Sequence, residues 1–197
     1  MRLFVAVYPP ADVVTHLSTL LSRLNLARPA DGPGTSLRLA PPEQWHVTLA
    51  FLGDVPDGAV SSAADAVELG VAEAAQAGPE TLDLRVAGAG RFGRGRFTIV
   101  WAGLHGDLDG LHALADSVRR QLRRARIPYD RKPLRPHLTL ARPGDRLPGE
   151  ALAADLAALD AYAGPPWSVG TVCLMRSQLG PVPRYDVVHR AVLSEQA

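Results

Sequence analysis

A nine-residue block occurs twice in this chain of 197 residues, and the repeat constrains the fold more than any other feature. The first copy is HVTLAFLGD at residues 46–54, and the second is HLTLARPGD at residues 137–145. The copies agree at six of nine positions and begin 91 residues apart, close to half the length of the chain. An internal repeat of this kind indicates two similar halves. We therefore expect a single bilobed domain over residues 1–197.

Each copy has the alternating pattern of a half-buried β-strand. In the first copy, strict alternation places His46, Thr48 and Ala50 on one face. The residues of the opposite face are apolar and are expected to pack into the core: Val47, Leu49 and Phe51. The second copy repeats the arrangement with His137 and Thr139. Each half thus presents one imidazole and one hydroxyl, two residues apart, on the face away from the core.

A near-twofold relation between the halves brings the two histidines face to face across a cleft. Two opposed imidazoles can carry out an in-line displacement at phosphorus, since one removes a proton from the nucleophile and the other protonates the leaving oxygen. The threonine hydroxyls can hydrogen-bond the non-bridging oxygens, whose charge grows in the transition state. A single histidine of this kind is read more simply as a core residue, but the paired context argues against that reading. Neither copy carries a carboxylate or a second histidine at ligand spacing, so no metal site is expected.

Apolar periodicity predicts strands and helices that alternate along the chain. The predicted strands share a run of apolar or alternating residues: 2–8, 45–52, 81–87, 96–104, 136–142, 168–175 and 185–192. The predicted helices share apolar residues at helical spacing: 11–26, 57–77, 108–122 and 150–159. Some predicted strands follow one another directly, and this favours an α+β fold over a strictly parallel sheet.

Residues 88–93, GAGRFG, match the glycine pattern of a dinucleotide-binding loop. Such a loop must open a helix whose N-terminus binds the pyrophosphate, but here β-branched and aromatic residues follow. We therefore expect a glycine-rich hairpin loop. Its arginines, Arg91, Arg94 and Arg96, are read either as solvated or as contacts to substrate phosphates.

The formal net charge is +1, but the charge is unevenly distributed. Residues 85–146 contain 14 of the 21 basic residues and only five acidic ones. A basic segment in a nearly neutral chain suggests an anionic partner such as nucleic acid. Codon bias is the simpler explanation for a chain in which arginine outnumbers lysine 20 to 1. The arginine-rich stretch from Arg119 to Lys132 is accordingly read as a solvated face or as an RNA-binding rim.

Several classes of protein are excluded by simpler features. No apolar run approaches the ~20 residues that span a bilayer. The first ten residues lack the cleavage site of a signal peptide. Cys173 is the only cysteine, so it can form neither an internal disulfide nor a thiolate metal cluster. We expect a cytoplasmic monomer that needs no metal and no cofactor and does not associate with membranes.

These motifs resemble the two-histidine (2H) phosphoesterase superfamily, and within it the bacterial and archaeal RNA 2′,3′-cyclic phosphodiesterases, also called 2′-5′ RNA ligases. The resemblance extends over nearly the whole chain and rests on five blocks: residues 2–7, 45–53, 97–101, 136–142 and 185–188. It implies a bilobed α+β fold with a pseudo-twofold axis, antiparallel sheets flanking a central cleft, and helices on the outer faces.

The resemblance also implies a reaction. A 2′,3′-cyclic phosphate at an RNA end or on a nucleotide is opened to a 2′-phosphate without metal, and reversible 2′-5′ RNA ligation is an associated activity. His46 matches the proton donor and His137 the proton acceptor. Thr48 and Thr139 match the phosphate-binding threonines. Phe51 and Arg142, each five residues after its histidine, match positions that contact the base and the phosphate.

Two questions stay open at the level of sequence. Strict alternation places Phe51 and Arg142 on the face opposite their histidines, so they reach the cleft only if each strand bends or ends there. Phe51 is as consistent with core packing as with base stacking. The activity also has rivals, since fold similarity does not settle substrate choice. These are hydrolysis of another small phosphodiester, such as ADP-ribose cyclic phosphate or a 2′-5′ oligoadenylate, and a nucleotide- or RNA-binding module without turnover.

Overall fold

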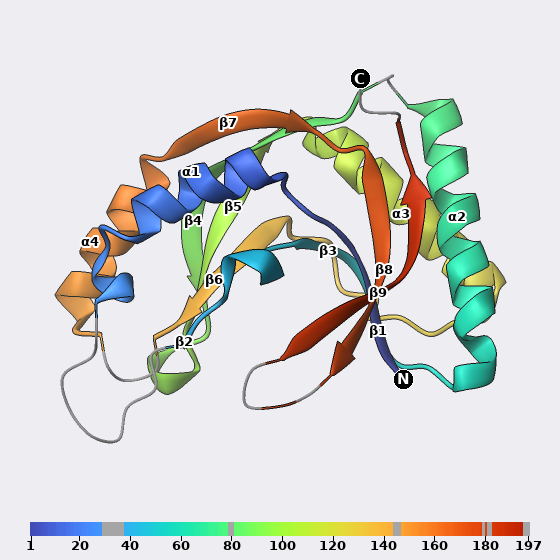
Figure 1. Ribbon diagram of the computed structural model, residues 1–197, viewed down its shortest axis with the longest axis horizontal. Coiled ribbons are helices and arrows are strands. Elements are labelled where there is room, and N and C mark those ends of the chain that lie inside the picture. Colours follow the sequence, from blue (N-terminus) through green and yellow to red (C-terminus); the bar gives the residue numbers. More distant parts are fainter. Residues whose placement is uncertain (29–37, 79–80, 144–146, 179, 181–182, 195–197) are drawn as a thin grey trace.

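The computed structural model describes residues 1–28, 38–78, 81–143, 147–178, 180 and 183–194, which form two antiparallel β-sheets and four α-helices (Figure 1). The first sheet has four strands in the order β3, β1, β8, β9. Their bounds are Val47–Asp54, Arg2–Val7, Thr171–Gln178 and Arg184–Val192. The motif strand β3 therefore lies at an edge of this sheet.

The second sheet has five strands in the order β2, β6, β5, β4, β7. Their bounds are Arg38–Leu39, His137–Arg142, Ile99–Gly106, Asp83–Phe92 and Ala163–Ser168. The second motif strand, β6, lies between β5 and the two-residue strand β2. The last two residues of the second motif copy, Gly144 and Asp145, lie outside the described residues.

Two helices lie against each sheet (Figure 1). Helices α2 (Val60–Ala77) and α3 (Leu108–Arg124) pack against each other and against strands of the four-stranded sheet. Helices α1 (Ala11–Leu21) and α4 (Gly149–Asp160) contact strands of the five-stranded sheet. Four single 3₁₀ turns complete the described structure: η1 (Asn25–Ala27), η2 (Pro42–Gln44), η3 (Asp57–Ala59) and η4 (Gly95–Phe97).

The sequence repeat corresponds to a repeat of topology. In each half a strand leads through a helix to the motif strand that pairs beside it: β1, α1, β3 in the first half and β5, α3, β6 in the second. The order β3, β1, β8, β9 of one sheet therefore matches the order β6, β5, β4, β7 of the other. The two motif strands also contact each other, so both histidines lie where the sheets meet.

The apolar faces of both sheets and the helices form one large buried cluster, which includes Val47, Leu49, Leu138 and Leu140 of the motif strands. A smaller apolar cluster lies on the other face of the four-stranded sheet. Its buried members are Phe4, Ala6, Cys173 and Met175, with Tyr8, Phe51 and Tyr185 packed against them. This second face, turned away from the main core, carries side chains of the candidate site.

Helices α2 and α3 approach closely at Gly70. A Cβ atom placed on Gly70 would lie 2.6 Å from Cα and 2.9 Å from the backbone nitrogen of Val118 on α3. Only a residue without a side chain fits at this crossing. Gly70 therefore sets the distance of α3 from α2.

Two strands differ from the sequence prediction. The glycine-rich segment expected as a hairpin loop is mostly strand, since β4 continues to Phe92 and pairs with β5. Gly88 has φ +76° at a register shift in this pair, and Gly90 lies so close to the Trp101 ring that no Cβ fits. Strand β7 was missed because Pro165 and Pro166 argue against a strand. It pairs with β4 at the edge of the sheet, where proline is tolerated.

Candidate active site

Both motif histidines are held by the same contact. Nδ1 of His46 lies 2.6 Å from the carbonyl oxygen of Gln44, and Nδ1 of His137 lies 2.6 Å from the carbonyl oxygen of Arg135. A carbonyl oxygen can only accept a hydrogen bond, so in each ring Nδ1 carries the proton and donates it. Nε2 is then the nitrogen of each imidazole that can exchange a proton with a ligand. The two copies of the repeat therefore hold their histidines in the same tautomer.

Each motif strand contains a β-bulge at the same position of the repeat. In β3, Thr48 pairs with Ala6 and Ala50 with Val5, so Leu49 is an extra residue. In β6, Thr139 pairs with Trp101 and Ala141 with Val100, so the extra residue is Leu140. A bulge of this kind reverses the alternation of the side chains that follow it.

The bulge corrects the prediction made from strict alternation. Ala50 is buried in the main core instead of sharing the face of His46 and Thr48. Phe51 pairs with Phe4 and packs against the second apolar cluster, on the same side as Thr48. In the second copy the equivalent shift returns Arg142 to the face of Thr139. Both positions five residues after the histidines therefore reach the histidine face, as the resemblance implies.

Each imidazole lies against aromatic rings. The ring centroid of His46 is 4.8 Å from that of Phe4, 5.5 Å from that of Tyr8 and 5.4 Å from that of Tyr185. His137 makes an edge contact with Phe92 at 5.0 Å and lies 6.2 Å from Trp101. Sequence reasoning missed Phe4, Tyr8 and Phe92 as site residues. For Phe4 and Tyr8 the available signal was their spacing of four residues, which places both on one face of the strand predicted over residues 2–8.

Burial lowers the pKa of His46 below its ordinary value of 6.5. The hydrogen bond to Gln44 opposes this shift, and the charge of His137 adds to it. The imidazole of His137 is therefore close enough to act on the protonation of His46. In the ligand-free protein the neutral form of His46 is favoured at neutral pH.

Positive charge reaches the same region from both sheets. Burial raises the pKa of Tyr185, and the nearby charges of Arg142 and Arg2 oppose that rise. Arg142 therefore lies near a ring that also contacts His46. The guanidinium carbon of Arg2 lies 4.9 Å from the centre of the Phe51 ring. An anion in the cleft would be attracted by both arginines.

A cavity of about 560 Å³ opens beside the motif strands. Its lining includes a hydroxyl, an imidazole, aromatic rings and cationic groups: Thr48, Phe51, Phe92, Arg119, Lys132, Arg135 and His137. A second cavity, of about 490 Å³, is lined by Tyr8 and Tyr185, the rings against which His46 packs. His46, Thr139 and Arg142 line neither cavity. The structure thus places Thr48, Phe51 and His137 around one cavity, and His46 against two aromatic rings of the other.

Among the described strands, β3 pairs only with β1, and its other edge is covered by α3 and the segment after it. Nε of Arg119 donates a hydrogen bond to the carbonyl oxygen of Leu49 (2.9 Å), and the backbone nitrogen of Asp130 donates one to the carbonyl oxygen of Phe51 (2.8 Å). These contacts satisfy carbonyl groups that an edge strand leaves open. Arg119 was predicted only as part of an arginine-rich stretch. In the structure Arg119 lines the active-site cavity.

Within the part of the chain that the structure describes, no three histidine, cysteine or acidic side chains gather as a set of metal ligands. The same residues include no helix long and apolar enough to cross a membrane.

Comparison with known proteins gives consistent results. The sequence profile described as the 2′-5′ RNA ligase superfamily matches residues 15–181. A protein of Thermus thermophilus named RNA 2′,3′-cyclic phosphodiesterase is 32% identical over 200 residues, covering 96% of this chain and 89% of that protein. One of the same name from Geobacillus stearothermophilus is 35% identical over 149 residues, which cover 74% of this chain. This chain spans 44% of that protein's length.

Solved structures share the fold. The crystal structure of TT0787 from Thermus thermophilus has a TM-score of 0.70 and 28% identity, with all of both chains covered. Escherichia coli LigT in its apo form has a TM-score of 0.69 and 22% identity, with 98% of both chains covered. The predicted α+β fold, with its two related antiparallel sheets and outer helices, is confirmed.

Proposed function

The chain belongs to the 2′-5′ RNA ligase superfamily, and on this premise we propose that it hydrolyses RNA 2′,3′-cyclic phosphate ends to 2′-phosphates without a metal ion. The resemblance inferred from the motifs is confirmed by this membership, and with it the prediction of a phosphodiesterase. The substrate and the residue roles rest on the site. The observation that carries them is the matched pair of imidazoles, each anchored through Nδ1 on a backbone carbonyl oxygen with Nε2 left for proton transfer.

In the proposed reaction His137 is the general base and His46 the general acid. Nε2 of His137 takes a proton from water as the water oxygen forms a bond to phosphorus. The bond from phosphorus to the 3′ oxygen breaks, and Nε2 of His46 gives its proton to that oxygen. The products are a 2′-phosphate and a free 3′-hydroxyl. Release of a proton from His137 to solvent and uptake of a proton by His46 restore both histidines.

The lowered pKa of His46 is compatible with the acid role. A phosphodiester anion bound beside the ring favours the imidazolium form, because an opposite charge at short range raises the pKa of a histidine. Without that anion, burial among Phe4, Tyr8 and Tyr185 disfavours the charge. Binding of substrate therefore favours the protonated form of His46 that the acid role requires.

The other site residues bind the phosphate and the nucleoside. The hydroxyls of Thr48 and Thr139 would hydrogen-bond the non-bridging oxygens, and the charge of Arg142 would stabilise the negative charge that grows on them. Phe51 lines the cavity beside Thr48 and offers a ring on which a base can stack.

The test is turnover of nucleoside 2′,3′-cyclic phosphates in the presence of EDTA, with the product identified by phosphorus NMR. We expect 2′-phosphate alone. His46→Ala and His137→Ala should each lower the rate by about 10²–10⁴, whereas His112→Ala, which removes an exposed imidazole on α3, should have no effect. Binding without turnover would contradict the proposal, as would activity that EDTA abolishes. Faster turnover of a 2′-5′ oligoadenylate or of ADP-ribose cyclic phosphate would assign the site to another phosphodiester.

A further inference from the structure

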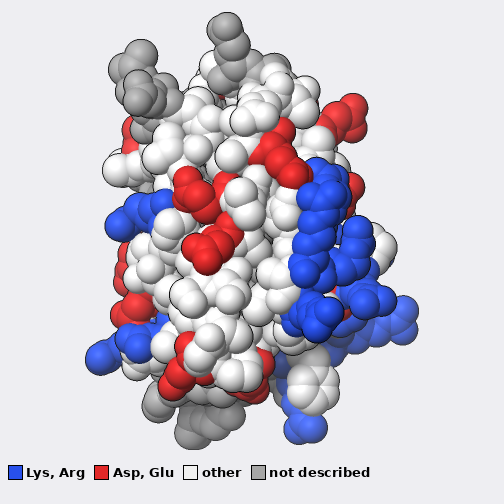
Figure 2. Space-filling view, turned by 90° about the vertical axis from the view of Figure 1, so that its right-hand side faces the viewer, with Lys and Arg blue, Asp and Glu red and all other residues white. Residues whose placement is uncertain are grey.

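A cationic surface lies beside the active site, along α3 and the segment that follows it. Figure 2 shows Lys and Arg side chains gathered along one edge of the side of the molecule that carries α2 and α3. Arg119, Arg120, Arg123 and Arg124 come from α3, and Arg131 from the segment after it. This is the arginine-rich stretch that the sequence leaves as either a solvated face or an RNA-binding rim.

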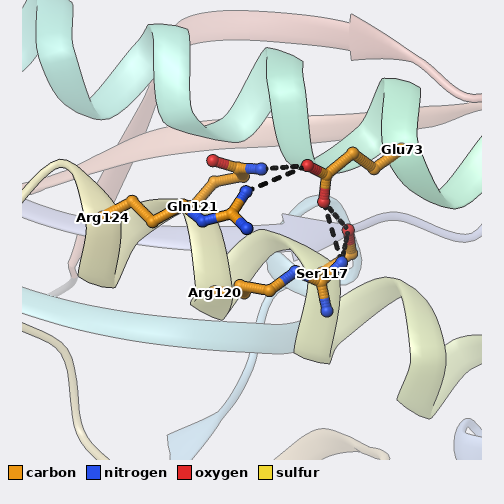
Figure 3. Close-up of polar contacts among 5 residues, drawn as sticks. All are labelled: Glu73, Ser117, Arg120, Gln121 and Arg124. Carbon is orange, nitrogen blue, oxygen red and sulfur yellow. Dashed lines mark hydrogen bonds and ion pairs between the residues drawn. The ribbon is translucent and has the colours of Figure 1, made fainter.

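The arginines of this surface differ in what they already bind. Glu73 of α2 forms ion pairs with Arg120 at 2.8 Å and Arg124 at 3.3 Å, and it also accepts hydrogen bonds from Ser117 and Gln121 (Figure 3). This network joins α2 to α3 and neutralises part of the positive charge.

Three further arginines lie outside that network. The Arg119 guanidinium donates to the carbonyl oxygens of Leu49 and Lys132. Arg123 and Arg131 are exposed and form no ion pair among the described residues. Those two are the cations of this surface that stay available to a ligand.

The available arginines line a cavity of about 420 Å³. Its lining is mainly cationic, with one acid and one aromatic ring: Asp116, Arg119, Arg120, Arg123, Tyr129 and Arg131. Arg119 also lines the active-site cavity, so the two cavities adjoin at this residue. A chain molecule whose end lies at His137 can therefore continue past Arg119 into the arginine cavity.

We infer that the arginine cavity binds the phosphates of the nucleotides that precede the reacting end, so that the preferred substrate is an RNA chain and not a mononucleotide. This inference rests on the proposed function and specifies its substrate. Unpaired arginines recognise phosphate through charge-assisted hydrogen bonds and carry no sequence information. Tyr129 is half-buried and packs against the main core, so its ring is a fixed platform for a base of any identity. Asp116 weakens the site by repelling the same phosphates.

The test compares two substrates on matched variants: a nucleoside 2′,3′-cyclic phosphate and a ten-nucleotide RNA with a 2′,3′-cyclic end. In the wild-type protein we expect a higher kcat/KM on the RNA. The double variant Arg123→Ala/Arg131→Ala should lose about tenfold in kcat/KM on the RNA and nothing on the mononucleotide. Arg23→Ala removes an exposed arginine that lies after α1 and lines neither cavity, so both rates should be unchanged. Asp116→Ala should act in the opposite direction and raise kcat/KM on the RNA.

Salt dependence gives a second readout that is independent of catalysis. Binding of a ten-nucleotide RNA with an uncyclised 3′-phosphate is followed by fluorescence anisotropy at several salt concentrations. Loss of two phosphate contacts should reduce the slope of log affinity against log salt by about 1.4, at about 0.7 per contact for a single strand. Equal kcat/KM for the two substrates, or an unchanged slope in the double variant, would overturn the inference. A protein that binds the RNA with the expected slope but hydrolyses neither substrate would contradict the proposed function and leave the arginine cavity in place.

Discussion

Replacing Gly70 by alanine tests whether the crossing of α2 and α3 is as close as the structure places it. The added Cβ would lie 2.6 Å from Cα of Val118 and 3.2 Å from the carbonyl carbon of Ser117. Both are backbone atoms of a helix, so no side-chain rotation can relieve the contact. The two helices must move apart, and the apolar contacts around the crossing weaken.

Two effects of opposite sign determine how much Gly70→Ala changes the free energy of unfolding. Overpacking costs about 1–3 kcal/mol, and a backbone neighbour favours the upper end of that range. Alanine in a helix interior is more favourable than glycine by about 1 kcal/mol. We therefore expect a net loss of about 1–2 kcal/mol in the free energy of unfolding. For a chain of this size that corresponds to roughly 2–8 °C in Tm.

The assay is thermal unfolding followed by circular dichroism, with urea denaturation as a second measurement. Gly149→Ala is the matched control, because Gly149 begins α4 and a Cβ there meets nothing within 4 Å. We expect the control to keep the wild-type Tm or to exceed it slightly. A Gly70→Ala protein as stable as the wild type would refute the close helix crossing.

Three further predictions concern the site. The pH profile of kcat/KM should be bell-shaped around neutrality with two apparent pKa values that belong to the coupled pair, so a rate that rises steadily from pH ~5 to ~9 would contradict the pairing. Burial lowers the pKa of His46 below 6.5, so the free energy of unfolding should fall as the pH drops below that value. In urea titrations, the free energy of unfolding of the His46→Gln variant should fall less over the same pH range. Phe51→Ala should raise KM about tenfold through lost stacking, whereas Phe51→Tyr should keep it.

The motif and the histidines were predictable because their signal is local. The repeat located His46 and His137, and alternation assigns Thr48 and Thr139 to the same face as these histidines. Alternation failed after the threonines, because a β-bulge depends on the strand that pairs alongside. Leu49 and Leu140 become extra residues only where Ala6 and Trp101 set the register of their neighbours. The sequence of a single strand does not contain that information.

Other features depend on contacts between distant segments. Strand β7 exists because β4 offers it an edge at which prolines are tolerated, and the residues 163–168 alone favour a loop. The arginine-rich stretch shows the same limit. Its composition does not distinguish Arg120, which Glu73 neutralises, from Arg123, which stays available. The two arginines differ because the packing of α2 against α3 brings Glu73 to Arg120 and not to Arg123.

The central claim is that His46 acts as the acid and His137 as the base, and leaving-group chemistry tests it most directly. A sugar alkoxide is a poor leaving group and needs a proton, whereas a nitrophenolate is stable as the anion. Loss of a general acid should therefore cost about 10²–10⁴ on the cyclic phosphate and far less on a nitrophenyl phosphodiester of a nucleotide. Loss of the general base should slow both substrates alike, because both need an activated water.

The measurement is kcat/KM of His46→Ala and His137→Ala on both substrates, relative to the wild-type protein. The account predicts that the nitrophenyl substrate selectively restores the activity of His46→Ala and leaves His137→Ala impaired. Selective rescue of His137→Ala would reverse the two roles. Full activity of either variant on the cyclic phosphate would contradict the two-histidine mechanism itself.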